Sequence, residues 1–287
     1  MRSFTAAMLV LAGCILLTAQ RQTQDVTGMV VEVKPSERLL VVSHDPVPGV
    51  MPAMIMSFEV RNDAQLRGLT PGTIVSFTLR ASSEGAYADD LRVVRYQSGE
   101  QDPLTVRRLR LLRSARAAAQ LDLNQMVPDF TLTDQVHKRI ALSQLRGKVV
   151  VMNFIYTSCA LPQFCYRMTN HFSVLQNRFE GRDGREVVLL SITFDPARDT
   201  PERLAEYAKQ WKADAARWHF LTGSSDEIAR VAAMFGLDYF PDEGLINHSL
   251  RTVVVDRAGR LLANVEGNRF TAQQLGDLVN AALINKK

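Results

Sequence analysis

Two short apolar segments place the strongest constraint on the fold of this chain. Residues 148–156 and 186–194 are rich in Val, Leu and Ile, and a segment with helical spacing follows each of them. Such runs are typical of strands that are buried on both faces of a sheet, as happens when helices cover the sheet. The chain from Met126 onward is therefore predicted to be an α/β domain with a mixed sheet.

The other predicted elements divide the chain into two folded parts. In the second part, helices are predicted over 167–179, 201–211, 226–235 and 271–283, with a hairpin over 251–265. In the first part, β-rich runs broken by turn signals occur at 27–33, 38–43, 56–60, 73–79 and 90–96. That spacing is typical of a small all-β barrel of the OB type, closed or partly closed. The predicted domains are a signal segment (1–21), the barrel (25–97), a helical linker (98–124) and the α/β domain (125–287).

The first residues have the features of an export signal. Arg2 precedes an apolar stretch over residues 6–19, which is shorter than the roughly 20 residues needed to span a bilayer. The sequence Leu-Ala-Gly-Cys at 11–14 is similar to a lipoprotein lipobox, in which Cys14 is acylated. Cleavage after Ala19, or an uncleaved anchor, is the competing interpretation. Each predicts a protein in the periplasm or on the outer face of the cytoplasmic membrane, held there through its N-terminus where a lipid or anchor remains.

The charge pattern argues against nucleic-acid binding. The formal net charge is +4, and the one basic run has no aromatic residues between its arginines, which are Arg107, Arg108, Arg110, Arg113 and Arg116. A solvated linker helix is the prediction, and a basic surface that faces anionic lipid is the alternative.

The cysteines define the main candidate site. Apart from Cys14, the chain has only Cys159 and Cys165, so one pair is the most that can form. They follow the first buried strand, where a helix N-terminus lowers thiol pKa values. Residues six apart on one helix cannot share a small ion, so Cys159 is predicted in a loop, with Pro162 as the first helical residue. The pair can then close on a metal or form a disulfide.

Histidine would complete this site. Together with the two thiolates, His248 would make a soft donor set suited to Cu(I) and also able to hold Cu(II). A structural role is the alternative for a single distant histidine. His137, His171 and His219 are predicted to be surface residues.

A second candidate site lies in the barrel. His44 precedes Met51, Met54 and Met56, and strand alternation places Met54 and Met56 on one face. Thioether sulfur favours Cu(I) or Ag(I), whereas the alternative is that the methionines are core residues and His44 a surface residue. Residues 26–96 resemble the CusF-like copper- and silver-binding domain, whose ligands match His44, Met54 and Met56. Met51 stands where that family has a tryptophan, so it is either a further sulfur ligand or leaves the metal uncapped.

The second domain resembles Sco/SenC proteins over residues 126–285. The resemblance rests on V-P-D-F-T-L at 127–132, F-I-Y-T-S-C at 154–159, S-I-T-F-D-P-A-R-D-T-P at 191–201 and N-H-S at 247–249. It implies a thioredoxin fold and copper binding through Cys159, Cys165 and His248, with Asp195 orienting the site. The family's C-P-x-x-C-P motif is replaced by a longer spacing, with Ala160 and Tyr166 in place of the prolines, so the ligand geometry is expected to differ.

Three functional hypotheses follow. The resemblance implies a metallochaperone that delivers copper to the CuA centre of a respiratory haem–copper oxidase, with oxidase subunit II as its partner. The main alternative is a thiol–disulfide oxidoreductase, in which Cys159 attacks a disulfide of a periplasmic partner and Cys165 resolves the mixed disulfide. The third is a copper or redox sensor. His248 favours the metal, because thioredoxins carry a cis-proline near this position.

Overall fold

The computed structural model describes residues 24–82, 85–95, 107, 111, 120–159, 161–181, 186–242 and 245–284. The predicted signal segment with Cys14 lies outside these residues. So does the basic run of the predicted linker, apart from Arg107. No helix in the described part of the chain is both long enough and apolar enough to cross a membrane.

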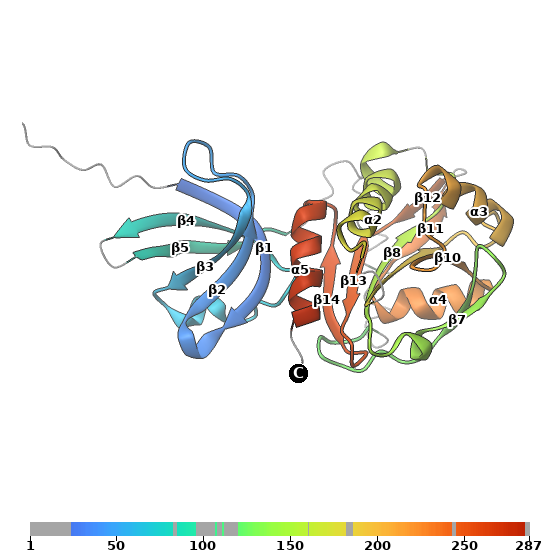
Figure 1. Ribbon diagram of the computed structural model, residues 1–287, viewed down its shortest axis with the longest axis horizontal. Coiled ribbons are helices and arrows are strands. Elements are labelled where there is room, and N and C mark those ends of the chain that lie inside the picture. The colour runs from blue at the N-terminus through green and yellow to red at the C-terminus, as the bar shows by residue number, and fades with distance from the viewer. Residues whose placement is uncertain are drawn as a thin grey trace, which may run out of the picture.

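Five strands close into a small barrel in the N-terminal part of the chain (Figure 1). They are β1 (Gln24–Lys34), β2 (Leu39–His44), β3 (Met54–Val60), β4 (Ile74–Ser82) and β5 (Gly85–Val93), in the order β1-β2-β3-β5-β4. Alternate residues point inward, so Phe58 and Val60 are buried while Glu59 between them is exposed. The barrel confirms the OB-type prediction. Its last strand begins before the predicted start at Asp90, and Ala88 in this earlier part belongs to the barrel core.

A mixed seven-stranded sheet forms the second domain. Its order is β14-β13-β8-β9-β10-β6-β7, with β8, β9 and β10 parallel to one another and the other pairs antiparallel. Every residue of β8 and β9 is buried, which confirms the prediction of strands covered on both faces. The strands are β6 (Thr131–Asp134), β7 (Arg139–Ala141), β8 (Val149–Ile155), β9 (Val187–Thr193), β10 (Trp218–Thr222), β13 (Arg251–Val255) and β14 (Leu261–Glu266).

The helices start at the signals that the sequence provides. Thr200 caps α3 by accepting a hydrogen bond from the backbone N–H of Arg203, and Pro201 occupies its first turn. Ser224 and Glu227 form a capping box on α4. The helices are α2 (Arg167–Arg178), α3 (Pro201–Gln210), α4 (Ser225–Met234) and α5 (Ala272–Ile284). A separate hairpin consists of β11 (Tyr239–Asp242) and β12 (Leu245–His248).

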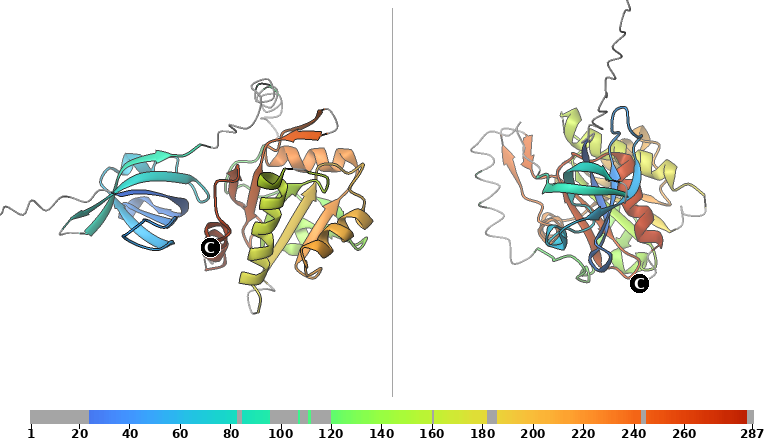
Figure 2. Two further views of the ribbon diagram at one scale, coloured as in Figure 1. Left: turned by 90° about the horizontal axis from the view of Figure 1, so that it is seen from above. Right: turned by 90° about the vertical axis from the view of Figure 1, so that its left-hand side faces the viewer.

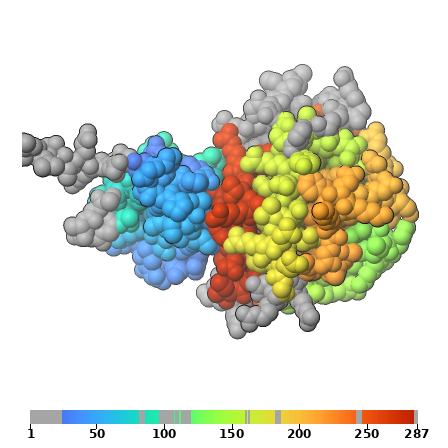
Figure 3. Space-filling model, turned by 45° about the horizontal axis from the view of Figure 1, so that its top comes forward, coloured from blue at the N-terminus to red at the C-terminus, as the bar shows by residue number. Residues whose placement is uncertain are grey.

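Helix α5 lies between the two domains. It packs against α2 and β8 on one side and against β1 and β2 of the barrel on the other. Figure 3 shows α5 as a red band between the barrel and α2, and Figure 2 shows the same order along the long axis. Met29 and Ile74 of the barrel belong to the apolar core of the second domain. Gly72 has a φ of +88°, and a Cβ there would lie 2.9 Å from Cγ2 of Val265, so the backbone of Gly72 packs closely against a side chain of β14.

Candidate metal centres

The cysteine pair lies at the carboxyl end of β8. Cys159 occupies the turn after this strand and is half-buried. Pro162 begins a π-helical turn (Pro162–Tyr166) that leads into α2, as the spacing predicted, and Cys165 lies buried within this turn. Both thiols are free. Single π-turns of this kind are common at functional sites because they reposition a side chain relative to the helix.

The two sulfurs differ sharply in proton affinity. The thiol of Cys165 donates a hydrogen bond to Cys159, and this bond is the main reason why the pKa of Cys159 lies far below that of an ordinary thiol. A smaller contribution to this low pKa comes from a hydrogen bond with His248, while burial acts in the opposite direction. The pKa of Cys165 is raised well above its ordinary value by the same hydrogen bond and by burial. Cys159 is therefore a thiolate at neutral pH, and Cys165 keeps its proton.

His248 approaches the cysteines from the hairpin, at the end of β12. Its Nδ1 lies 2.9 Å from the carbonyl oxygen of Ser249, and the imidazole also forms a hydrogen bond with Cys159. Aromatic rings surround the imidazole, with centroids 4.6 Å away for Phe194, 5.9 Å for Tyr156 and 6.4 Å for Phe164. The structure thus brings Cys159, Cys165 and His248 together in an apolar setting that limits access of water.

A buried carboxylate fixes the turn that carries Cys159. Asp199 accepts hydrogen bonds from the backbone N–H of Thr157 at 3.0 Å and from its hydroxyl at 2.5 Å. Thr193 donates a third, at 2.6 Å. The carboxylate of Asp195, which the sequence suggested as the orienting residue, instead pairs with Arg198 at 3.3 Å. The sequence analysis did not single out Asp199, because its contact with the cysteine turn joins two segments that are distant in the sequence.

Hydrogen bonds link Cys159, Cys165 and His248, which are not arranged in a coordination geometry. Among the described residues, no three His, Cys, Asp or Glu side chains are already arranged as a metal site. Two thiols and an imidazole remain the soft donor set that copper prefers. Metal binding would replace the proton that Cys165 shares with Cys159.

The barrel site lies at the end of β2. His44 is only 1% exposed, and its Nδ1 donates to the carbonyl oxygen of Asp45 at 2.7 Å. Nε2 is buried and has no hydrogen-bond partner among the residues that the structure describes. An unpaired buried nitrogen costs on the order of 1–3 kcal/mol, so its presence fits a position that accepts a ligand. The backbone is crowded here, because a Cβ on Gly28 would lie 2.7 Å from the Cα of His44.

The candidate methionines lie on or next to the strand that pairs with β2. Met54 is directly opposite His44 across the β2–β3 pair, and Met56 is two residues further along the same face. Met54 is 41% exposed, whereas Met56 and Met51 are partly buried against the barrel core. The imidazole of His44 and the thioethers of Met54 and Met56 therefore lie on paired strands at one end of the barrel, a set that fits Cu(I) or Ag(I).

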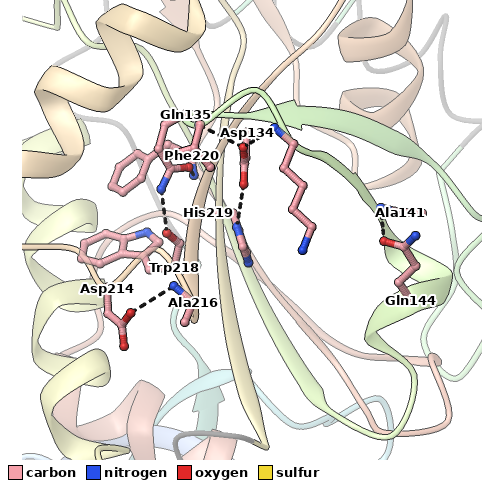
Figure 4. A network of polar contacts seen from close by, with 11 residues as sticks. Asp134, Gln135, Ala141, Gln144, Asp214, Ala216, Trp218, His219 and Phe220 are labelled. Atoms are coloured by element: carbon pink, nitrogen blue, oxygen red, sulfur yellow. Dashed lines mark hydrogen bonds and ion pairs between the residues drawn. The ribbon is translucent and has the colours of Figure 1, made fainter.

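The remaining histidines occupy positions that the sequence did not predict. His137 is exposed, as expected, but His171 and His219 are buried. The Nδ1 atom of His219 lies 3.1 Å from the carboxylate of Asp134, and Figure 4 shows this pair within a network on β6 and β10. The expectation that both are surface residues was wrong. Their burial depends on partners distant in the sequence, such as Asp134 for His219 and Phe270 for His171.

Comparisons with known proteins match both domains. A family model described as SCO1/SenC matches residues 118–283, and one described as copper binding periplasmic protein CusF matches residues 23–91. The SCO1 protein homolog of Bacillus subtilis (strain 168) is 34% identical over 111 residues, which are 38% of this chain and 56% of that protein. The match thus spans little more than half of that relative.

Solved structures of other proteins are similar to the second domain. BsSco, described as a member of the Sco family of cytochrome c oxidase assembly proteins, is 28% identical with a TM-score of 0.50. It covers 58% of this chain and 98% of its own. A SCO1/SenC family lipoprotein from Bacillus anthracis str. Ames is 27% identical with a TM-score of 0.50, covering 56% and 96%. The SCO1/SenC match spans more than half of the chain, which therefore belongs to the SCO1/SenC family and carries a CusF-like barrel ahead of its thioredoxin-like domain.

Proposed function

We propose that this protein binds copper at two sites, one in each of the units 25–97 and 125–287, and delivers it for assembly of the CuA centre of a respiratory oxidase. One observation carries the proposal: the Cys159 thiolate is held between the Cys165 thiol and His248. Sulfur donors with an imidazole favour copper, and Cu(I) in particular. Copper is the cargo here, and it remains in the chain only until an acceptor takes it.

The environment of the cysteines fits a site that retains copper and then releases it to an acceptor. Aromatic rings around His248 keep water from the bound ion, while Cys159 is partly exposed. Leu161 and Tyr166, at the two ends of the turn that contains Cys165, are exposed apolar residues. An acceptor could dock on them and exchange its own ligands for Cys159 first. Subunit II of the oxidase, which holds the CuA centre, is the proposed acceptor.

An exported location is part of the proposal. Copper transfer to an oxidase takes place outside the cytoplasm, and the barrel matches a family described as periplasmic. The B. anthracis relative is described as a lipoprotein, which supports acylation at Cys14 as the form of attachment to the membrane.

Copper stoichiometry of the reduced full-length chain tests the proposal. We expect two tightly held Cu(I) ions in competition with a chromophoric chelator. Cys159→Ser and Cys165→Ser should each remove one ion, because a hydroxyl is a poor ligand for a soft metal. His44→Ala should remove the other ion and leave the cysteine site filled. Unchanged stoichiometry in both cysteine variants would contradict copper binding by this pair.

A second candidate function is thiol–disulfide exchange with a periplasmic partner. It is favoured by the low pKa of Cys159, which makes this sulfur a good nucleophile next to a resolving thiol. In such a reaction the Cys159 thiolate attacks the partner's disulfide. Cys165 then closes the intramolecular disulfide and the partner leaves as a dithiol. His248→Ala distinguishes the two functions by degree. It should abolish tight copper binding, whereas disulfide exchange should continue because both thiols remain and the hydrogen bond from Cys165 still lowers the pKa of Cys159.

A further inference from the structure

The segment before and within the first turns of α5 contacts the surroundings of both candidate sites. Asn268 donates a hydrogen bond from Nδ2 to the carbonyl oxygen of Gln163 at 2.6 Å. Gln163 belongs to the turn between Cys159 and Cys165. One end of the segment is therefore attached to the cysteine loop.

The other end of the segment is attached to the barrel. Gln274 donates from Nε2 to the carbonyl oxygen of Ser43 at 3.2 Å and to the carboxylate of Asp45 at 3.1 Å, so it contacts the residues on either side of His44. Gln273 donates to the carbonyl oxygen of Ala53 at 3.4 Å, immediately before Met54. The residues that flank two barrel ligands are thus bound by consecutive glutamines.

A buried ionic contact strengthens this connection. The hydroxyl of Ser43 donates to the carboxylate of Asp277 at 2.6 Å, and Asp277 also pairs with Arg178 at 2.5 Å. Arg178 is the last residue of α2, the helix that begins just after Cys165. Ser43 and Asp277 are buried, so their hydrogen bonds are made in only one orientation of the barrel on α5.

Apolar packing lies beside these polar contacts. Met29 and Ile74 of the barrel are buried against the second domain. Together, the two kinds of contact argue for a barrel docked in one position rather than tethered by a flexible linker. In that position the end of the barrel with His44 and Met54 and the cysteine loop are bound to the same ten residues, 268–277.

We propose that copper passes within one chain, from His44, Met54 and Met56 to Cys159, Cys165 and His248, and that residues 268–277 are the bridge that docks the two sites for this transfer. This inference rests on the proposed function. Cu(I) leaves the imidazole and thioethers of the barrel and binds two thiolates and an imidazole. Cys165 releases its proton to solvent, and no electron is transferred. Anionic thiolates bind Cu(I) more strongly than neutral thioethers, so transfer is favoured in this direction.

Transfer kinetics at low protein concentration test the proposal. The full-length chain, with its cysteines oxidised to a disulfide, is loaded with one Cu(I) in the barrel, and a phosphine reductant in excess starts the reaction. The ultraviolet absorption of copper bound to thiolate reports arrival at the cysteines. At about 1 μM protein, a docked acceptor has an effective concentration on the order of 1 mM, so transfer should be up to about 1,000-fold faster than between chains.

The reference is transfer between two different full-length variants. The donor is Cys159→Ser/Cys165→Ser with copper in its barrel, and the acceptor is copper-free His44→Ala/Met54→Leu with reduced cysteines. We expect the wild-type rate to stay constant on dilution and to exceed the rate of this pair. A wild-type rate that falls with dilution to that of the pair would overturn the inference.

Variants of the bridge complete the test. Asn268→Ala should slow the wild-type reaction by about tenfold, the effect of losing one hydrogen bond, with two copper ions still bound. Gln274→Ala removes two hydrogen bonds and should slow the reaction at least as much. Gln65→Ala, at a glutamine away from the bridge, should leave the rate unchanged. Equal rates in all three would overturn the role of the bridge. If the cysteines bind no copper in any experiment, the proposed function itself fails, and that result is distinct from slow transfer to a competent site.

Discussion

The carboxylate of Asp199 accepts hydrogen bonds from both the backbone N–H and the hydroxyl of Thr157, two residues before Cys159. Asp199 is completely buried, so its charge depends on these donors and on the hydroxyl of Thr193. The start of α3 thereby holds the turn that presents the reactive sulfur. The turn that carries Cys159 is thus positioned by a residue from the end of a different strand.

Replacing Asp199 should weaken both the fold and the site. Asp199→Asn keeps the shape but directs an NH2 group at donors, and we expect a loss of about 2–3 kcal/mol in the free energy of unfolding. Copper affinity of the cysteine site should fall because the turn is no longer fixed. Urea unfolding and Cu(I) competition measure the two effects.

Asp195→Asn is the matched control for this substitution. Its partner Arg198 is more than half exposed, so losing this ion pair should cost less than about 1 kcal/mol. If Asp195→Asn lowered copper affinity as much as Asp199→Asn, the assignment of Asp199 as the residue that positions the turn would be wrong.

The low pKa of Cys159 predicts an unusual alkylation profile. Because Cys159 is a thiolate well below neutral pH, iodoacetamide should modify it at pH 5–6 about as fast as at pH 8. Cys165, buried and with a raised pKa, should remain unmodified in the folded chain. Mass spectrometry of the labelled peptides gives the rate for each cysteine.

His248 should contribute to that profile. His248→Ala removes a hydrogen bond that stabilises the thiolate, so the pKa of Cys159 should rise and its labelling at pH 5 should slow relative to pH 8. His137→Asn, at an exposed histidine, should leave the profile unchanged. A wild-type profile with the midpoint of an ordinary thiol would contradict the hydrogen-bonded arrangement of the three residues.

The local sequence pattern predicted the strands and helices of this protein well, but it predicted the contacts of individual side chains poorly. The burial of β8 and β9 and the start of the turn at Pro162 follow from residues within each segment. The hairpin of β11 and β12, which carries His248, has strands of only four residues and no strong alternation. Its position depends on contacts with distant segments, such as that of Phe194 with His248.

Asp195 and Asp199 also show that sequence spacing does not tell which side chain contacts a distant segment. Asp195 and Asp199 lie in one short motif after β9, and either could turn towards the cysteines as far as spacing alone indicates. Only the folded chain shows that Asp199 meets Thr157 from a different strand end. In the same way, the bridge formed by Asn268 and Gln274 joins residues more than a hundred positions apart.

If the barrel binds metal as proposed, strand alternation predicts that Met54 is a ligand and that Ile55 is not. Met54→Leu preserves volume but removes a sulfur ligand, so Ag(I) and Cu(I) affinity of the barrel should fall by at least about tenfold. Ile55→Leu, on the opposite face of β3 and similarly exposed, should have no effect. The measurement uses full-length chains that also carry Cys159→Ser and Cys165→Ser, so that only the barrel binds. Equal affinity in both variants would contradict the assignment of Met54.

Buried His171 predicts how stability depends on pH. Burial, with a smaller contribution from Arg167, lowers the pKa of His171 from 6.5 to about 4. Between these values the unfolded chain binds a proton at His171 that the folded chain does not, so stability falls as the pH drops from 6.5 towards 4. The full effect is on the order of 3 kcal/mol. Urea unfolding at pH 7.5 and at pH 4.5 should show this loss in the wild type.

The control variant His171→Leu distinguishes the protonation of His171 from that of other groups that titrate between pH 7.5 and 4.5. His171→Leu fills the same space beside Phe270 without a titrating group, so its stability should decrease less between the two pH values. His219, whose pKa is also lowered by burial, remains in both proteins and contributes equally. His137→Asn should keep the wild-type dependence, because the histidine is exposed and asparagine tolerates its positive φ of 62°. If His171→Leu and the wild type lost the same stability, His171 would have to be protonated in the folded chain, which its unpaired buried Nδ1 and apolar surroundings oppose.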